Sequence, residues 1–243
     1  MPYRRLPNTD KARLRALEKA FKKMESEGSR SVPYSESSMT ALRNFLPKFQ
    51  HSIISLEADR KNQVKKNKEY TDIMRKARMY ISHYIQVMNF AISRNELKPQ
   101  VREFYQLVDY GSALPPLNSE KDILDWGKKI IDGDHKRILS GGSPIYNPSI
   151  ALVKVNFEKF IDAYHFQKTL QANTDRSANT VNTLRNQADQ LILQLWNEIE
   201  NKFEHLSDSQ KRERSQQYGV AYVLRKSESA RIAASTLQPR LNF

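Results

Sequence analysis

The sequence predicts an all-α protein, an antiparallel helical bundle of four main helices in two hairpins, with accessory helices at the N-terminus and in the middle. Apolar residues recur at spacings of three and four along most of the 243 residues. No stretch sustains the alternation of Val, Ile, Thr and aromatic residues that marks a strand, so we expect no substantial sheet. Glycine is scarce, with seven residues.

The first element that we expect is a basic N-terminal helix. Its apolar residues lie at helical spacing, at Leu14, Leu17, Phe21 and Met24. Asn8 or Thr9 can cap its start, because the side-chain oxygen of such residues accepts a free backbone N–H. A serine-rich linker, SEGSRSVPYSESS, follows this helix.

Two long stretches, 48–98 and 149–218, contain neither glycine nor proline. Each consists of an apolar stripe, a polar patch and a second apolar stripe, and the patches are ADRKNQVKKNKEYTD and QANTDRSANTVN. Each stretch could be a hairpin that turns at its patch, or one helix of about 50–60 residues. We favour hairpins, because helices much longer than about 25 residues are unusual in globular domains. Pro47, within the first stripe, predicts a kink or a helix restart.

Two shorter helices are expected in the middle of the chain. One begins after Pro99, since proline suits a first turn, and ends near Gly111. The next is capped by Asn118 or Ser119, and acidic residues in its first turns favour the positive end of the helix. The clearest break in the chain is SGGSPIYNPS at 140–149.

These elements predict four consecutive segments. They are a basic helix and linker at 1–34, a first helical unit with accessory helices at 35–140, a second helical unit packing on the first at 141–226, and a flexible tail at 227–243. A chain of this length can bury roughly 70–75% of its unfolded surface, so it can fold without disulfides.

Composition excludes several classes of protein. Cysteine is absent, which rules out disulfides, thiol catalysis and zinc sites built on thiolates. The longest apolar runs, such as VAYVL at 220–224, are far too short to span a membrane. No apolar stretch follows the basic N-terminus, so we expect no secretory signal and predict a soluble, cytoplasmic protein.

The net charge of +13 is unevenly distributed. Residues 1–98 carry 21 Lys and Arg against 10 Asp and Glu, whereas residues 99–207 carry 12 against 14. Such asymmetry can mark a surface for an acidic partner, but we favour a surface that is basic for solubility.

Three clusters of cations are candidate contacts for an acidic partner. They are Lys11, Arg15, Lys19 and Lys22 in the first helix; Arg60, Lys61, Lys65, Lys66 and Lys68 in the first polar patch; and Lys211, Arg212 and Arg214 near the C-terminus. If the first patch were a hairpin tip, its five cations would crowd together, as phosphate binding requires. No known nucleic-acid motif accompanies these clusters.

No catalytic, cofactor-binding or metal-binding residue is predicted, and no cofactor is expected. Residues 141–143, Gly-Gly-Ser, lack the lysine of a phosphate loop and are interpreted as a linker. Asp132 with His135, and Asp162 with His165, each place an acid and a histidine on one helix face. Bundle metal sites use Glu in this pattern and add a Glu from each of two other helices, so we interpret both pairs as solvated polar faces.

Three segments carry a resemblance to a known family: 1–20, 117–137 and 141–155. They resemble uncharacterised helical proteins from Bacteroidetes bacteria, and the likeness extends over most of the chain. The resemblance implies a bacterial, intracellular, helical protein. The family has no assigned activity, so no functional residue follows from it.

The sequence therefore predicts a non-catalytic helical binding or scaffold protein. Its partner is expected to be a protein, or a second copy of itself, because long amphipathic helices meet partners through apolar faces. The alternative is a nucleic-acid-associated protein that uses the basic N-terminal third. A third class, a metal-dependent bundle enzyme, rests only on Asp162 and His165. No membrane partner and no small-molecule substrate are indicated.

Overall fold

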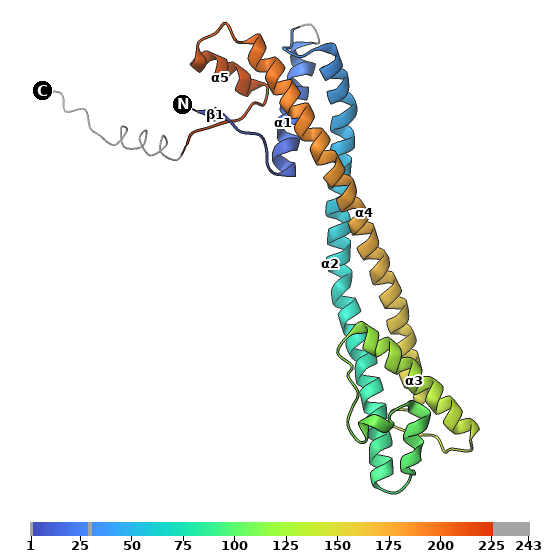
Figure 1. Ribbon diagram of the computed structural model, residues 1–243. Coiled ribbons are helices and arrows are strands. Elements are labelled where there is room, and N and C mark those ends of the chain that lie inside the picture. The colour runs from blue at the N-terminus through green and yellow to red at the C-terminus, as the bar shows by residue number, and fades with distance from the viewer. Residues whose placement is uncertain (1, 29–30, 226–243) are drawn as a thin grey trace, which may run out of the picture. The chain divides into compact units, whose positions relative to one another are not determined.

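The all-α prediction is confirmed by a computed structural model, which describes residues 2–28 and 31–225 (Figure 1). The predicted flexible tail at 227–243 lies outside the described residues. In chain order the helices are α1 (Asp10–Glu27), α2 (Glu36–Ser93), α3 (Glu120–Leu139), α4 (Ile150–Lys202) and α5 (Asp208–Gln217).

Short elements complete the fold. Two 3-10 helices, η1 (Pro99–Tyr105) and η2 (Val108–Tyr110), stand where the sequence predicted one helix after Pro99. Strands β1 (Tyr3–Arg4) and β2 (Tyr222–Val223) pair antiparallel, with Tyr3 opposite Val223. The break at 140–149 is the connection between α3 and α4.

The predicted hairpins are wrong, because α2 and α4 are each one continuous helix, of 58 and 53 residues. The helix α2 also runs through Pro47 without restarting. Its polar patch contains no glycine or proline, and most of it is Lys, Arg, Glu, Ala and Gln, which are good helix formers. The patch therefore interrupts the apolar stripe without ending the helix.

The polar patch of α4 is richer in Asn, Thr and Ser, which favour turns when they bond to backbone groups outside a helix. Here the threonine hydroxyls bond within the helix instead. Thr174 donates to the carbonyl of Leu170 at 3.0 Å, and Thr180 donates to the carbonyl of Arg176 at 3.0 Å. These bonds satisfy the polar side chains locally, so the helix continues through the patch.

Helix starts are capped as their sequences allow. Thr9 accepts from the backbone N–H of Ala12 and caps α1. Ser119 caps α3 and forms a capping box with Asp122. The sequence predicts each cap as one of two neighbouring residues, and the structure shows Thr9 and Ser119 in that role.

The chain divides into two compact units. Unit 1 comprises Met1–Ala58 and Asp175–Phe243, and unit 2 comprises Asp59–Thr174. Each unit combines one part of α2 with one part of α4. The units are defined by spatial proximity, so they are not the consecutive segments, divided at residues 34, 140 and 226, that the sequence predicts.

Unit 1 has its own apolar core. The helix α1 lies beside the first part of α2 and the last part of α4 (Figure 1). Fully buried side chains from all three helices fill this core, among them Leu17, Leu42, Phe49 and Trp196. The segment after α5 closes it through Tyr218 and Val220.

Unit 2 has a second core, formed by the last part of α2, the first part of α4, α3 and the 3-10 helices. Its fully buried side chains include Ile81, Tyr84, Tyr105, Ile123 and Phe160. Between Leu56 and Tyr70 on α2, the described residues include no buried side chain. The polar patch thus separates the buried residues of α2 in unit 1 from those in unit 2.

Two glycines on α3 allow close packing in unit 2. A Cβ added at Gly127 would lie 2.2 Å from Cε2 of Phe157. At Gly133 it would lie 2.5 Å from the backbone carbonyl oxygen of Phe104 and 2.7 Å from Cδ1 of Tyr105. Because backbone atoms cannot rotate away, Gly133 permits the approach of η1 to α3.

We predict that Gly133→Ala destabilises the protein by about 1–2 kcal/mol. Overpacking costs about 1–3 kcal/mol, and a clash with backbone atoms lies at the upper end of that range. Replacing glycine by alanine in a helix gains about 1 kcal/mol, so a net loss of stability remains. Urea unfolding measures the difference. His135→Ala, an exposed change on the same helix, should stay within about 0.5 kcal/mol of wild type. A Gly133→Ala protein as stable as wild type would contradict the close approach.

Candidate functional site

The basic residues at the start of the chain fall into two groups. Three of them form ion pairs within unit 1: Arg4 with Glu200 at 2.9 Å, Arg13 with Asp189 at 2.8 Å, and Lys23 with Glu27 at 2.9 Å. The pairs of Arg4 and Arg13 hold β1 and α1 to α4, and the pair of Lys23 lies within α1. These cations are therefore structural. The other cations among residues 2–28 are exposed.

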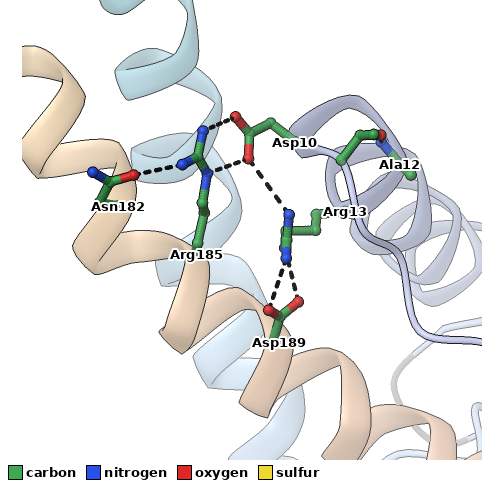
Figure 2. A network of polar contacts seen from close by, with 7 residues as sticks. Asp10, Ala12, Arg13, Asn182, Arg185 and Asp189 are labelled. Atoms are coloured by element: carbon green, nitrogen blue, oxygen red, sulfur yellow. Dashed lines mark hydrogen bonds and ion pairs between the residues drawn. The ribbon is translucent and has the colours of Figure 1, made fainter.

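Figure 2 shows the network that joins α1 to α4. Arg13 donates through Nε and Nη2 to the two carboxylate oxygens of Asp189, at 2.8 and 2.9 Å. Arg185 donates in the same two-pronged way to Asp10, at 2.7 Å for both bonds. The hydrogen bond to Asp189 raises the pKa of Arg13 above its ordinary value. The paired forks fix the register of α1 against α4.

The first predicted cluster, Lys11, Arg15, Lys19 and Lys22, is exposed along one side of α1. None of the four has an ion-pair partner within residues 2–28 and 31–225. Arg15 and Lys19 border a shallow depression of about 240 Å³, together with Pro7 and the segment around Gly219. This cluster is brought together as predicted.

The second predicted cluster does not converge. Because α2 is continuous, the residues from Arg60 to Lys68 are distributed around a helix and do not meet at a hairpin tip. Lys61, Lys65 and Lys68 share one side and are exposed. Lys66 lies on another side and pairs with Glu69 at 3.0 Å.

The third cluster, Lys211, Arg212 and Arg214, lies on α5 in unit 1, like the first cluster. Lys211 and Arg212 are half-buried, and Arg214 is exposed. The hydrogen bond from Tyr218 lowers the pKa of Glu27, and the charges of Lys23 and Arg214 add to this effect. Arg214 thus already faces an acid within the chain.

The two Asp/His pairs stay isolated. Asp132, His135, Asp162 and His165 are all exposed. In the part of the chain that the structure describes, no three His, Asp or Glu side chains gather in a way that could hold a metal ion.

Sequence reasoning missed a groove in unit 2. It has a volume of about 340 Å³ and lies between α2 and α4. Its apolar wall consists of Tyr70, Ile73, Ala163 and Phe166, and its polar rim of Lys66, Glu69, Lys159, Asp162 and Gln167. We call it the α2–α4 groove.

One buried polar atom in this groove has no partner among the described residues. Gln167 is 4% exposed, and its Nε2 donates to Oδ1 of Asn67 at 3.4 Å. Its Oε1 is buried and accepts no hydrogen bond from any described residue. A buried acceptor is ordinarily satisfied, so this amide oxygen is an exception in the wall of the groove, and its burial keeps it out of reach of a ligand lying in the groove.

The groove wall is braced from α3. Tyr70 donates to Oε1 of Glu120 at 2.6 Å, and Lys168 donates to Oε2 of the same carboxylate at 3.0 Å. Burial raises the pKa of Tyr70, and its hydrogen bond to Glu120 raises it further. The tyrosine therefore stays a neutral donor and holds the wall in place.

A buried polar network lies deeper in unit 2. Tyr84 and Tyr105 donate to Oδ1 of Asp134, at 2.5 and 2.9 Å, and Arg137 pairs with the same carboxylate at 2.7 Å. Arg137 also donates to the carbonyl of Ser143 at 2.6 Å. Burial raises the pKa of Tyr105 to about 12. The two tyrosines, Asp134 and Arg137 are each at most 3% exposed, so this network is structural.

These sites differ in how far the sequence could reveal them. The exposed side of α1 follows from helical spacing. The α2–α4 groove requires the register between two helices that are distant in sequence, which periodicity does not contain. Asp134 and Arg137 have i,i+3 spacing, the one signal for the buried network, but ordinary surface pairs share it.

Comparison with protein-family models, with curated proteins and with solved structures finds no match. The resemblance to helical Bacteroidetes proteins therefore stays a prediction. Among the described residues, no helix has both the length and the apolar character that crossing a membrane requires.

We predict that Arg13→Gln destabilises the protein and that Arg15→Gln does not. Arg13 is largely buried in its ion pair, with 12% of its side chain exposed, whereas Arg15 on the same helix is exposed. Loss of two charge-assisted hydrogen bonds should cost about 1–2 kcal/mol, measured by urea unfolding. Equal stability of the two variants would show that the Asp189 pair does not hold α1.

Proposed function

We propose that the chain is a non-catalytic helical binding or scaffold protein whose partner is a protein that docks on the α2–α4 groove. The observation that carries this proposal is the open apolar wall of the groove beside Phe166, which is 50% exposed. Large exposed aromatic side chains at the edge of a concave surface are typical of protein interfaces.

The chemistry of the groove supports binding. Its rim carries two lysines and two acids in mixed order, which suits a polar interface rim. Its volume lies at the low end for small-molecule pockets, and such pockets normally enclose most of their ligand. An amphipathic helix, which uses anchors at i, i+3, i+4 and i+7, can lie along a wall formed by two helices.

A photo-crosslinking experiment tests this proposal. A benzophenone amino acid replaces Phe166 in the full chain, which is expressed in its source cells and irradiated. The matched control carries the same group at Phe90, which lies in the same unit, is 60% exposed and does not line the groove. We expect protein adducts from position 166 and none above background from position 90.

Two outcomes would contradict the proposal. Adducts of equal yield from both positions would mean that exposure alone explains capture. The absence of any protein adduct at position 166, with the protein folded by circular dichroism, would mean that the groove binds no protein in the cell.

The alternative, a nucleic-acid-associated protein, is favoured by a separate observation. The exposed side of α1 carries Lys11, Arg15, Lys19 and Lys22, which have no ion-pair partner among the described residues. Cations free of internal pairing can neutralise phosphates and release counterions, which makes the affinity depend on salt.

Binding of labelled duplex DNA at several salt concentrations tests this alternative. If it holds, Lys11→Gln with Lys22→Gln should reduce the slope of log affinity against log salt by about 2, because two lysines no longer neutralise a phosphate each. Lys61→Gln with Lys68→Gln removes the same charge from unit 2 and should leave the slope unchanged. If the unmodified protein does not bind DNA at low salt, the alternative is wrong.

A further inference from the structure

One side of α4 in unit 2 carries an exposed stripe. Leu152, Val155 and Phe166 are 48%, 45% and 50% exposed. With Lys159 and Asp162, also exposed, they follow the alternating three-four spacing of a coiled-coil seam. We call residues 152, 155, 159, 162, 166 and 169 the α4 stripe. Its last member, Thr169, is exposed too.

The α4 stripe is self-complementary when two copies run antiparallel. A two-fold axis between residues 160 and 161 places Val155 opposite Phe166 of the second copy, and Phe166 opposite Val155. The same axis places Lys159 opposite Asp162, and Leu152 opposite Thr169. One axis thus pairs each position of the stripe reciprocally, as an isologous interface requires. Two apolar layers then flank a centre of opposite charges.

The central charges have no competing partner. Lys159 and Asp162 form no ion pair or hydrogen bond with any described residue, although they are three positions apart on one helix. Elsewhere on the same helix Lys154 pairs with Glu158 at 3.9 Å. The charge pair in the stripe is thus available to a second copy, on which it would form two ion pairs.

We propose that the α4 stripe binds the α4 stripe of a second copy of this chain, antiparallel, with Lys159 of each copy paired to Asp162 of the other. This proposal rests on the proposed function and names the partner of the same surface, since Lys159, Asp162 and Phe166 also line the α2–α4 groove. The charge order selects a second copy, because an unrelated antiparallel helix would need a lysine three residues before an acid, between two apolar layers, by chance.

The interface is small. Eighteen residues of helix extend over about 27 Å, and three apolar side chains per copy bury less than the standard interface of about 1,600 Å². The dimer is therefore weak and dissociates on dilution. Sedimentation velocity between about 1 µM and about 1 mM covers the range of such interfaces.

Charge reversal tests the pairing in the full chain. Lys159→Asp sets four acids against one another at the centre of the dimer, and Asp162→Lys sets four lysines there. Each single variant should weaken self-association by at least about tenfold. Lys154→Asp makes the same charge change on the same helix outside the stripe and should self-associate like wild type.

Mixing restores the association that each variant lacks. An equimolar mixture of Lys159→Asp and Asp162→Lys should form a heterodimer, because acids then face lysines at every central position. The double variant with both changes should dimerise again by itself. Lys159 and Asp162 are both exposed, so the substitutions should not disturb the core. Circular dichroism checks that each variant keeps the helical content of wild type.

The outcomes separate this proposal from the proposed function. The antiparallel pairing is wrong if the protein is a monomer at all concentrations. It is also wrong if the single charge reversals leave the dimer intact and mixing the two variants does not favour a heterodimer. If photo-crosslinking at position 166 then still captures another protein, the proposed function stands without self-association. If position 166 captures nothing as well, both are wrong.

Discussion

The fold depends on one constraint: neither α2 nor α4 can bury its apolar stripe without the other. In unit 1, Leu42 and Phe49 of α2 share a core with Leu184 and Trp196 of α4. In unit 2, Ile81 of α2 shares a core with Phe157 and Phe160 of α4. The other helices cover sides that this pairing leaves open. Hydrophobic burial is the dominant favourable term in folding, so the core that the two long helices share stabilises each unit.

Polar contacts select the register within that apolar pairing. Glu198 of α4 accepts from the backbone N–H and hydroxyl of Ser35 and from the hydroxyl of Ser38, at the start of α2. Burial acts to raise the pKa of Glu198, but these hydrogen bonds outweigh it and hold the pKa below its ordinary value. In unit 2 the hydrogen bond from Tyr84 to the buried Asp134 holds α2 against α3 in a similar way. A shifted register between α2 and α4 would take the half-buried Glu198 away from its serine partners, which is costly.

The sequence predicts the helices well and their pairing poorly, for a physical reason. Spacing and capping are local, so the all-α class, the Thr9 and Ser119 caps and the exposed side of α1 could be predicted. Whether a polar patch ends a helix depends on what the flanking stripes pack against, which is not local. The hairpin prediction was wrong on this point. The expected crowding of Arg60 to Lys68 depended on a hairpin tip, so it was wrong too. The α2–α4 groove was missed because Tyr70 and Phe166 meet only through that pairing.

Cross-linking between introduced cysteines tests the central pairing most directly, because the chain has no cysteine of its own. Ser35→Cys with Gln194→Cys places two thiols beside Glu198, which bonds to Ser35 and accepts from Gln194. Ser35→Cys with Ser93→Cys places them at the two ends of α2, which a hairpin turning at the polar patch would bring together. With a short bismaleimide, we predict intramolecular cross-linking in the first pair and none in the second. Cross-linking of the second pair and not of the first would contradict the pairing of α2 with α4.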